Sequence, residues 1–320
     1  MQRLKQINWH RVSWIVAIEV AIGMMIFAFF YSRGIDVGGG MDTIRYYKPF
    51  ADGCLECGFI PYFAQLLLSP LILAPGGFVW PYWTMFSLSG LLLIARETKI
   101  NPLIFLLTFP MIGQYWLGQI DVFVCLGALL AIRSKNPYWR GAGLTLMLVK
   151  PQIAVLAVIF LLIREERKQL LKVVFVPTAV LLISLAIYGV DWPVKWFLNA
   201  ATSIPDHPWK MASEFLWPWG LVLLPLPFLF MEREEGTLVS LMVSSLAMPF
   251  FSVYSYVVFL VFESPWWVLP LSYAYRLFYP WLGLKVMKMA WLLPMGMLLV
   301  HLARRFDLPE LLKRRLEGTP

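Results

Sequence analysis

Polar side chains at four places interrupt an otherwise apolar chain and could do chemistry. The first is Asp42, which follows the glycines at 38–40 just after the first apolar run. Glycines permit backbone conformations that other residues avoid, so this loop can fold back toward the membrane surface. A carboxylate held there could act as a general base on a hydroxyl group. The alternative is a solvated loop acid beside Arg45 and Lys48.

The second place is the segment WLGQIDVF, which contains Gln119 and Asp121. A glutamine side chain can donate and accept hydrogen bonds, and an aspartate can pair with a cation or accept from a sugar hydroxyl. Both residues could therefore line a substrate cavity. A polar turn, with Asp121 near the start of the following helix, explains the same pattern.

The third place is LVKPQIAV, where Lys150 lies alone in a long apolar run. Pro151 follows directly and breaks a helix at that point. A lysine at membrane depth is costly unless it is paired or hydrated. A snorkelling lysine needs a nearby helix end, and none is obvious here. The pattern favours a cation that binds a buried phosphate.

The fourth place is the polar stretch SIPDHPWKMASEF, with His207 and Lys210. These two residues could contact a substrate, or they could simply be loop residues. Further along, MPFFSVYSY adds Tyr254 and Tyr256, for which packing is the default interpretation.

Other chemistry has little support in the sequence. Cys54 and Cys57 form the pattern CLEC, but no second cysteine pair or histidine cluster completes a metal site. A local disulfide and two free thiols both remain open. The chain has no P-loop, HExxH motif or nucleophile elbow, which disfavours an ATP-driven pump and the soluble hydrolases.

Composition sets the class of protein that must position these residues. Of the 320 residues, 60% are hydrophobic and only 14% are charged, whereas roughly a quarter of the residues in a soluble domain are charged. The mean hydropathy is +0.70. These values predict an all-α polytopic membrane protein in which 1–320 forms a single transmembrane domain. The net charge of +8 is typical of the positive-inside bias and does not indicate nucleic-acid binding.

Basic residues beside apolar runs predict the topology. Such clusters occur near the N-terminus, at 96–99, 133–140 and 164–172, and in a basic tail at 304–320. All of them are predicted to be cytoplasmic, so that both termini lie on the cytoplasmic side of the plasma membrane. The first external loop is then 32–59, which carries Asp42, and the second is 190–212. The segment 213–230 is predicted to descend again as a span.

The spacing of these clusters predicts broken helices. Only residues 141–163 separate Arg140 from Arg164, yet a single span needs about 20 apolar residues. We expect two hairpins of short helices, 102–113 with 117–132 and 141–149 with 152–163, and a third from 236–249 with 250–262. The alternative is that one basic cluster lies outside. The total is about ten or eleven full and half-length membrane segments.

The order of these features resembles that of a known class. The chain has a first span, then DTIRYYKPF, IPYFAQLLLSPLILAP, a long segment from GQIDVF to LVKPQIAV, and finally LAMPFFSVYSYVVF. Over roughly residues 12–265 it resembles the GT-C class of membrane glycosyltransferases. Within that class it looks most like the polyprenyl-phosphate-mannose-dependent mannosyltransferases and related arabinofuranosyltransferases of bacterial cell envelopes.

The resemblance implies a bundle of full and broken helices, with a polyprenyl-phosphate sugar entering from the lipid. Carried over to this chain, it makes Asp42 the catalytic base and Lys150 a contact to the donor phosphate, with Gln119 and Asp121 lining the cavity. No cofactor is implied, and a divalent metal is not required. The further candidates for substrate binding are Arg45, Tyr46, Tyr47, His207, Lys210 and Tyr256.

The function expected from this resemblance is that of an inverting glycosyltransferase. It would move mannose, another hexose or a pentose to a lipid or glycan acceptor at the outer face. Its partners would be membrane lipids and these substrates, with no nucleic acid. Two alternatives stay open. One is a transporter or flippase for a lipid-linked anion, with Lys150 as the counter-ion. The other is a non-catalytic subunit that keeps the fold.

Overall fold

The computed structural model describes residues 8–32, 39–203, 216–248 and 251–307. Every regular element in these ranges is helical and none of the described residues forms a strand, so the predicted all-α class is confirmed.

Four helices among the described residues are long and apolar enough to cross a membrane. They are α1 (Trp9–Tyr31), the segment Gly76–Thr98, α10 (Arg167–Tyr188) and the segment Lys285–Arg305. The second of these contains α4 (Val79–Thr98), and the fourth ends in α16 (Leu292–Arg305). Helix α10 buries only Val173 and Ser184, as expected of a helix that faces lipid on most sides. The predicted count of ten or eleven membrane segments is not confirmed, because several other apolar segments are much shorter.

The middle of the chain consists of short helices that end at local breaks. They are α5 (Pro102–Leu107), α6 (Phe109–Leu117), α7 (Asp121–Arg133), α8 (Pro137–Met147) and α9 (Pro151–Ile163). Asn101 and Asn136 cap the starts of α5 and α8, each followed by a proline at the first helical position. The breaks at 118–120 and 148–150 match the two predicted hairpins. The helix predicted at 102–113 is split at Thr108, because Pro110 cannot continue the turn that precedes it.

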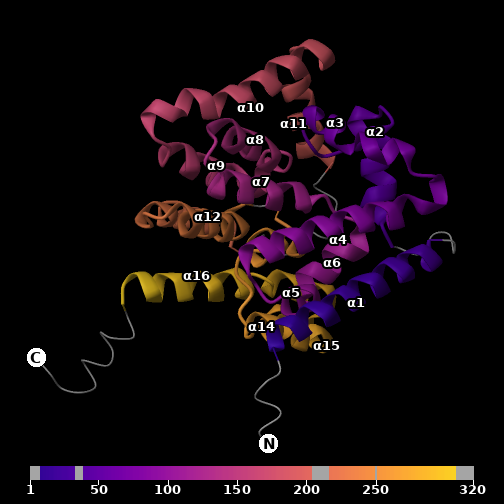
Figure 1. The fold of residues 1–320 in the computed structure, drawn as a ribbon, viewed down its shortest axis with the longest axis vertical. Helices are drawn as coiled ribbons and strands as arrows, with labels where there is room; N and C mark the ends of the chain where they lie inside the picture. Colours follow the sequence, from indigo (N-terminus) through magenta and orange to yellow (C-terminus); the bar gives the residue numbers. More distant parts are fainter. Residues whose placement is uncertain (1–7, 33–38, 204–215, 249–250, 308–320) are drawn as a thin grey trace, which may run out of the picture.

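The remaining helices are short, apart from α11 and α12. They are α2 (Lys48–Ala51), α3 (Gln65–Leu68), α11 (Trp192–Ser203), α12 (Arg233–Ala247), α13 (Val257–Leu260), α14 (Val268–Ala274) and α15 (Tyr279–Leu282). Helix α11 lies within the predicted second external loop. Of the predicted span at 213–230, the described residues 216–230 hold two 3-10 turns, Trp219–Leu223 and Leu226–Leu229, because repeated prolines interrupt a regular helix there. In Figure 1, α7, α8, α9 and α10 lie at one end of the bundle, and α1, α5 and α14 lie toward the other.

Salt bridges join the ends of the short helices at one face, which we call the basic end. The buried carboxylate of Glu165, just after α9, pairs with Arg140 of α8 at 2.8 Å and with Arg233 of α12 at 3.0 Å. Arg233 also donates to the carbonyl of Ala131 in α7 at 3.0 Å. The start of α8 and the end of α9 therefore meet, which is the arrangement expected of a hairpin.

Helix α16 joins the same face through His301. Its imidazole Nδ1 lies 3.2 Å from Glu235 of α12, and its Nε2 lies 2.7 Å from Glu263, which follows α13. The start of α12 and the segment after α13 are thus adjacent, as the third predicted hairpin requires. Because these ends meet at the basic end, the turns between them lie at the opposite end of the short helices.

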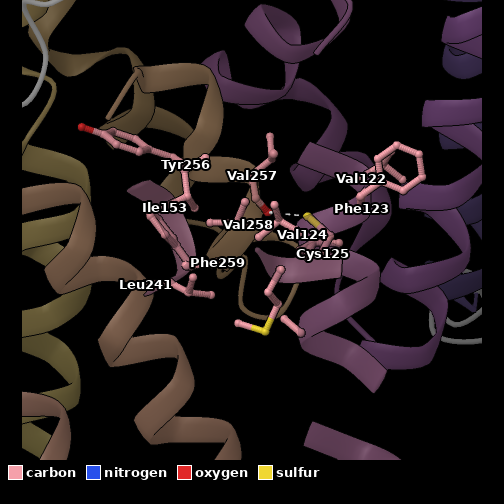
Figure 2. Close-up of a cluster of buried hydrophobic side chains, with 14 of the residues drawn as sticks. Val122, Phe123, Val124, Cys125, Ile153, Leu241, Tyr256, Val257, Val258 and Phe259 are labelled. Carbon is pink, nitrogen blue, oxygen red and sulfur yellow. Dashed lines mark hydrogen bonds between the residues drawn. The ribbon is translucent and has the colours of Figure 1, made fainter. Parts of the chain in front are cut away.

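Close packing holds α7 against its neighbours. A side chain at Gly127 of α7 would meet the carbonyl oxygen of Gly143 of α8 at 2.6 Å, so only glycine permits this backbone approach. On another side, Figure 2 shows Val124 and Cys125 of α7 facing Val257 of α13, with the Cys125 thiol 3.9 Å from the Val257 carbonyl. Ile153 of α9 belongs to the same buried core. This packing fixes the first residue of α7, Asp121, in place.

Candidate active site

Four turns that are far apart in the sequence meet at one buried polar cluster. They are the first loop at 39–47, the break after α6 at 118–120, the break after α8 at 148–150, and the 3-10 turn Val253–Tyr256. Hydrogen bonds and one salt bridge join all four. The two predicted hairpin turns and the loop of Asp42 are thus brought together.

Gln119 is the centre of this cluster. Its side-chain oxygen accepts from the Lys150 ammonium at 2.6 Å and from the Tyr47 hydroxyl at 2.8 Å. Its side-chain nitrogen donates to the carboxylate of Asp42. Because two donors surround the oxygen and a carboxylate faces the nitrogen, the orientation of the amide is determined by its partners. Through these hydrogen bonds, Gln119 links the ammonium of Lys150 to the carboxylate of Asp42, the predicted base.

Lys150 is fully paired by the residues around it. Its ammonium lies 2.7 Å from Asp121, and the two side chains are 5% and 0% exposed. Ser255 donates to the other carboxylate oxygen of Asp121 at 3.0 Å. The ring of Tyr254 lies under the ammonium, 5.3 Å from its centroid. Such a pair is stable in a buried site only when its remaining hydrogen bonds are also satisfied, as they largely are here.

Local backbone geometry brings Asp42 to this cluster. The residues Thr43–Tyr47 form a turn of π-helix directly after Asp42, and such turns are frequent at functional sites. The hydroxyl of Thr43 donates to the carbonyl of Gly118 at 2.5 Å, and the amide of Gly40 donates to the carbonyl of Trp116 at 2.6 Å. Gly118 adopts φ of 69°, and any side chain there would overlap the Thr43 hydroxyl.

The environment of Asp42 suits a base. Burial raises the pKa of its carboxyl group from 3.8 to about 6, and the nearby Lys150 and the hydrogen bond from Gln119 offset part of this effect. A carboxylate with a pKa near the operating pH is an effective proton acceptor, because it is mostly ionised yet still basic.

A cavity of about 300 Å³ is lined in part by Met41, the residue directly before Asp42. Its walls are mostly apolar and include Met41, Ile112, Trp116 and Met287. Tyr254, whose ring lies under Lys150, forms part of the wall as well. The cavity is therefore adjacent to the polar cluster through Met41 and Tyr254.

The other predicted site residues lie in different surroundings. Arg45 is exposed on the π-helical turn, and Tyr46 stacks against Phe59 with ring centroids 5.0 Å apart. Tyr256 is fully buried, with rings of the core at 5.4 and 5.8 Å, and Figure 2 shows it within the hydrophobic cluster. Of the SVYSY residues, Tyr254 and Ser255 reach the polar cluster instead. His207 and Lys210 lie outside the described residues.

The sequence contained a signal for Tyr254 and Ser255, namely polar groups within an apolar stretch, but it did not show which of them points inward. Thr43 carried a similar signal next to Asp42. Arg276, which lines the cavity, carried the signal of an isolated cation in an aromatic stretch.

The CLEC loop is closed by a disulfide between Cys54 and Cys57. Trp196 of α11 donates to the carbonyl of Phe59 at 3.1 Å, and Asn199 of α11 donates to that of Glu56 at 2.8 Å. This loop therefore supports α11. Within the described ranges, no group of three or more histidine, cysteine or acidic side chains is placed to hold a metal ion.

An all-helical bundle with apolar spans, whose broken helices converge on one buried polar cluster, has the character of a GT-C-type membrane glycosyltransferase. The model of glycosyltransferase family 87 matches residues 60–208, and this match is consistent with that class. The matched range contains Gln119, Asp121 and Lys150. No curated protein and no solved structure matches the chain.

Proposed function

We propose that this protein is an inverting glycosyltransferase that moves a sugar from a polyprenyl-phosphate donor to a hydroxyl group of a lipid or glycan acceptor. The observation that carries the proposal is the position of Asp42. Its carboxylate is oriented by Gln119, and Gln119 is itself held by Lys150 and Tyr47. Met41, the residue directly before Asp42, lines the adjacent cavity.

The reaction uses this arrangement as follows. The Asp42 carboxylate takes the proton of the acceptor hydroxyl while the acceptor oxygen forms a bond to the anomeric carbon. On the opposite side of that carbon, the bond to the phosphate oxygen breaks, and its electron pair leaves with the polyprenyl phosphate. Because the bond forms on the face opposite to the one that breaks, the configuration at the anomeric carbon inverts.

Lys150 has a defined place in this proposal. It fixes the amide of Gln119 and balances the charge of Asp121. The role expected from the sequence was a direct contact with the donor phosphate. For that contact, the ammonium would have to bind the phosphate in addition to Gln119 and Asp121.

The location follows from the same reasoning. We place the site at the outer face of the plasma membrane, with both termini in the cytoplasm. The arginines gathered at the basic end support this orientation, because basic residues favour the cytoplasmic side.

The test is transfer by the purified protein from a radiolabelled polyprenyl-phosphate sugar. Removing a general base lowers the rate by roughly 10²- to 10⁴-fold, so Asp42→Asn should lose nearly all transfer. Asp52→Asn is the matched control, since Asp52 lies on the same loop and its exposed carboxylate pairs with Lys48. Transfer by Asp42→Asn at the wild-type rate would refute the assignment of the base.

The same preparation separates the alternatives. A transporter would move lipid-linked sugar across a proteoliposome membrane without forming a glycosylated product. A non-catalytic subunit would purify with a stable partner and show no transfer on its own.

A further inference from the structure

The cavity beside Asp42 has a cation in its wall that the polar cluster does not use. Arg276 lies in the 3-10 turn Tyr275–Phe278, directly after α14, and its side chain is exposed. Among the described residues it forms no salt bridge, whereas Lys150 is paired with Asp121 at 2.7 Å. Arg276 is therefore the cavity cation whose charge is available to a ligand.

The guanidinium of Arg276 has a defined position. It lies over the ring of Phe109, 4.9 Å from the centroid, and Phe109 lines the same cavity. Stacking on an aromatic ring holds the planar group while leaving its N–H donors at the edge. An arginine presented in this way binds phosphate oxygens with two parallel hydrogen bonds.

The rest of the cavity fits a hydrocarbon chain. Ile112, Trp116 and Met287 form apolar walls, and the exposed side chains Leu277 and Phe278 follow Arg276 along the chain. An apolar cavity with an arginine in its wall and an apolar surface beside it matches a ligand with a phosphate head and a lipid tail.

Charge also favours an anion at Arg276. With Asp42 ionised, the polar cluster carries two carboxylates, Asp42 and Asp121, against the single ammonium of Lys150. A phosphate brought next to this cluster would be repelled unless another cation met it. Arg276 supplies that charge in the wall of the cavity that Met41 and Tyr254 also line.

We propose that this cavity binds the isoprenoid phosphate of the donor, with Arg276 as the contact to the phosphate and the apolar walls around the first isoprene units. This inference rests on the proposed function. As the bond between the sugar and the phosphate oxygen breaks, negative charge grows on that oxygen, and the guanidinium stabilises it. Arg276 thus acts on the leaving group while Asp42 acts on the acceptor.

The first arm of the test measures binding, without turnover, in lipid nanodiscs. Radiolabelled polyprenyl monophosphate should bind the wild-type protein, unlabelled polyprenyl monophosphate should displace it, and inorganic phosphate should not. Arg276→Gln should weaken binding by about 10- to 100-fold, because a hydrogen bond to a charged group is lost. Arg276→Lys should recover part of it, because the charge remains while the paired hydrogen bonds do not.

The matched control is Lys285→Gln, which removes an exposed cation nine residues later that does not line the cavity. It should bind like wild type. The thermal midpoint of each variant in the same nanodiscs shows whether it is folded, and Arg276→Lys keeps the test informative if Arg276→Gln is unstable. Equal binding by wild type and a folded Arg276→Gln would overturn the inference.

The second arm measures transfer kinetics. Arg276→Gln should raise the KM for the donor or lower kcat while leaving the KM for the acceptor unchanged. If the wild type transfers sugar and Arg276→Gln matches it in every constant, the inference fails and the proposed function stands. If the wild type binds polyprenyl monophosphate through Arg276 but never transfers sugar, the proposed function fails and the binding site stands.

Discussion

Replacing Lys150 with methionine should destabilise the protein, because the buried carboxylate of Asp121 would lose the cation that compensates its charge. The carboxylate of Asp121 is 0% exposed and has Lys150 as its cation at 2.7 Å. Methionine fills a similar volume but carries no charge, so Asp121 would remain buried with only the hydrogen bond from Ser255. Breaking a buried ion pair in this way costs about 3–5 kcal/mol.

The double variant Lys150→Met/Asp121→Asn separates this cost from loss of packing. Asparagine keeps an acceptor for Ser255 but has no charge to compensate. Because replacing both partners of a buried ion pair is often close to neutral, the double variant should recover most of the stability lost by Lys150→Met. The change in the free energy of unfolding of the double variant should therefore differ from the sum of the two single changes by about 1–3 kcal/mol or more.

The assay is thermal unfolding in detergent micelles, followed by tryptophan fluorescence at a fixed scan rate because unfolding of such proteins is often irreversible. A loss of this size should lower the midpoint of Lys150→Met by roughly 10 °C. The double variant should unfold within a few degrees of wild type. A double variant as unstable as Lys150→Met would show that the ammonium contributes by packing and not by compensating Asp121, and would refute the reasoning.

Three further predictions concern Asp42 and the contact of its loop with Gly118. Because burial raises the pKa of Asp42 to about 6, transfer should level off above pH 7 and fall about tenfold per pH unit below pH 6, where the protonated acid cannot accept a proton; a profile flat down to pH 5 would contradict this. Since the unfolded group titrates near 3.8, the folded state binds the proton more tightly. The contribution of Asp42 to the free energy of unfolding should therefore decrease as pH rises from about 4 to 6, a slope that Asp42→Asn should lack. Gly118→Ala should lower the thermal midpoint, because φ of 69° alone costs an L-residue about 1–2 kcal/mol and the new methyl group would overlap the Thr43 hydroxyl. The same substitution in a Thr43→Ala background should cost less, and an equal cost in both backgrounds would exclude the clash.

Much of the secondary structure could be predicted because its causes are local. Pro151 and Gly118 break helices through the sterics of their own backbone, and Asn136 caps α8 through its own side chain. The hairpins followed from these breaks and from the spacing of the basic clusters. The number of full spans could not be predicted in this way. Hydropathy does not distinguish a helix that faces lipid, such as α10, from one buried in protein, such as α9.

By itself the sequence determined that this is an apolar all-helical chain, that Asp42, Gln119, Asp121 and Lys150 lie at helix breaks or in a loop, and that burying such groups needs compensation. Only the tertiary structure decided which groups compensate which. Gln119 meets Asp42 and Lys150 across 77 and 31 residues of sequence. These partnerships depend on how packed helices are rotated and how closely they approach, as at Gly127 and Gly143. The same rotation turns Tyr254 toward Lys150 and Tyr256 into the core, because neighbouring residues on a helical turn point in different directions and only packing selects which of them faces the site.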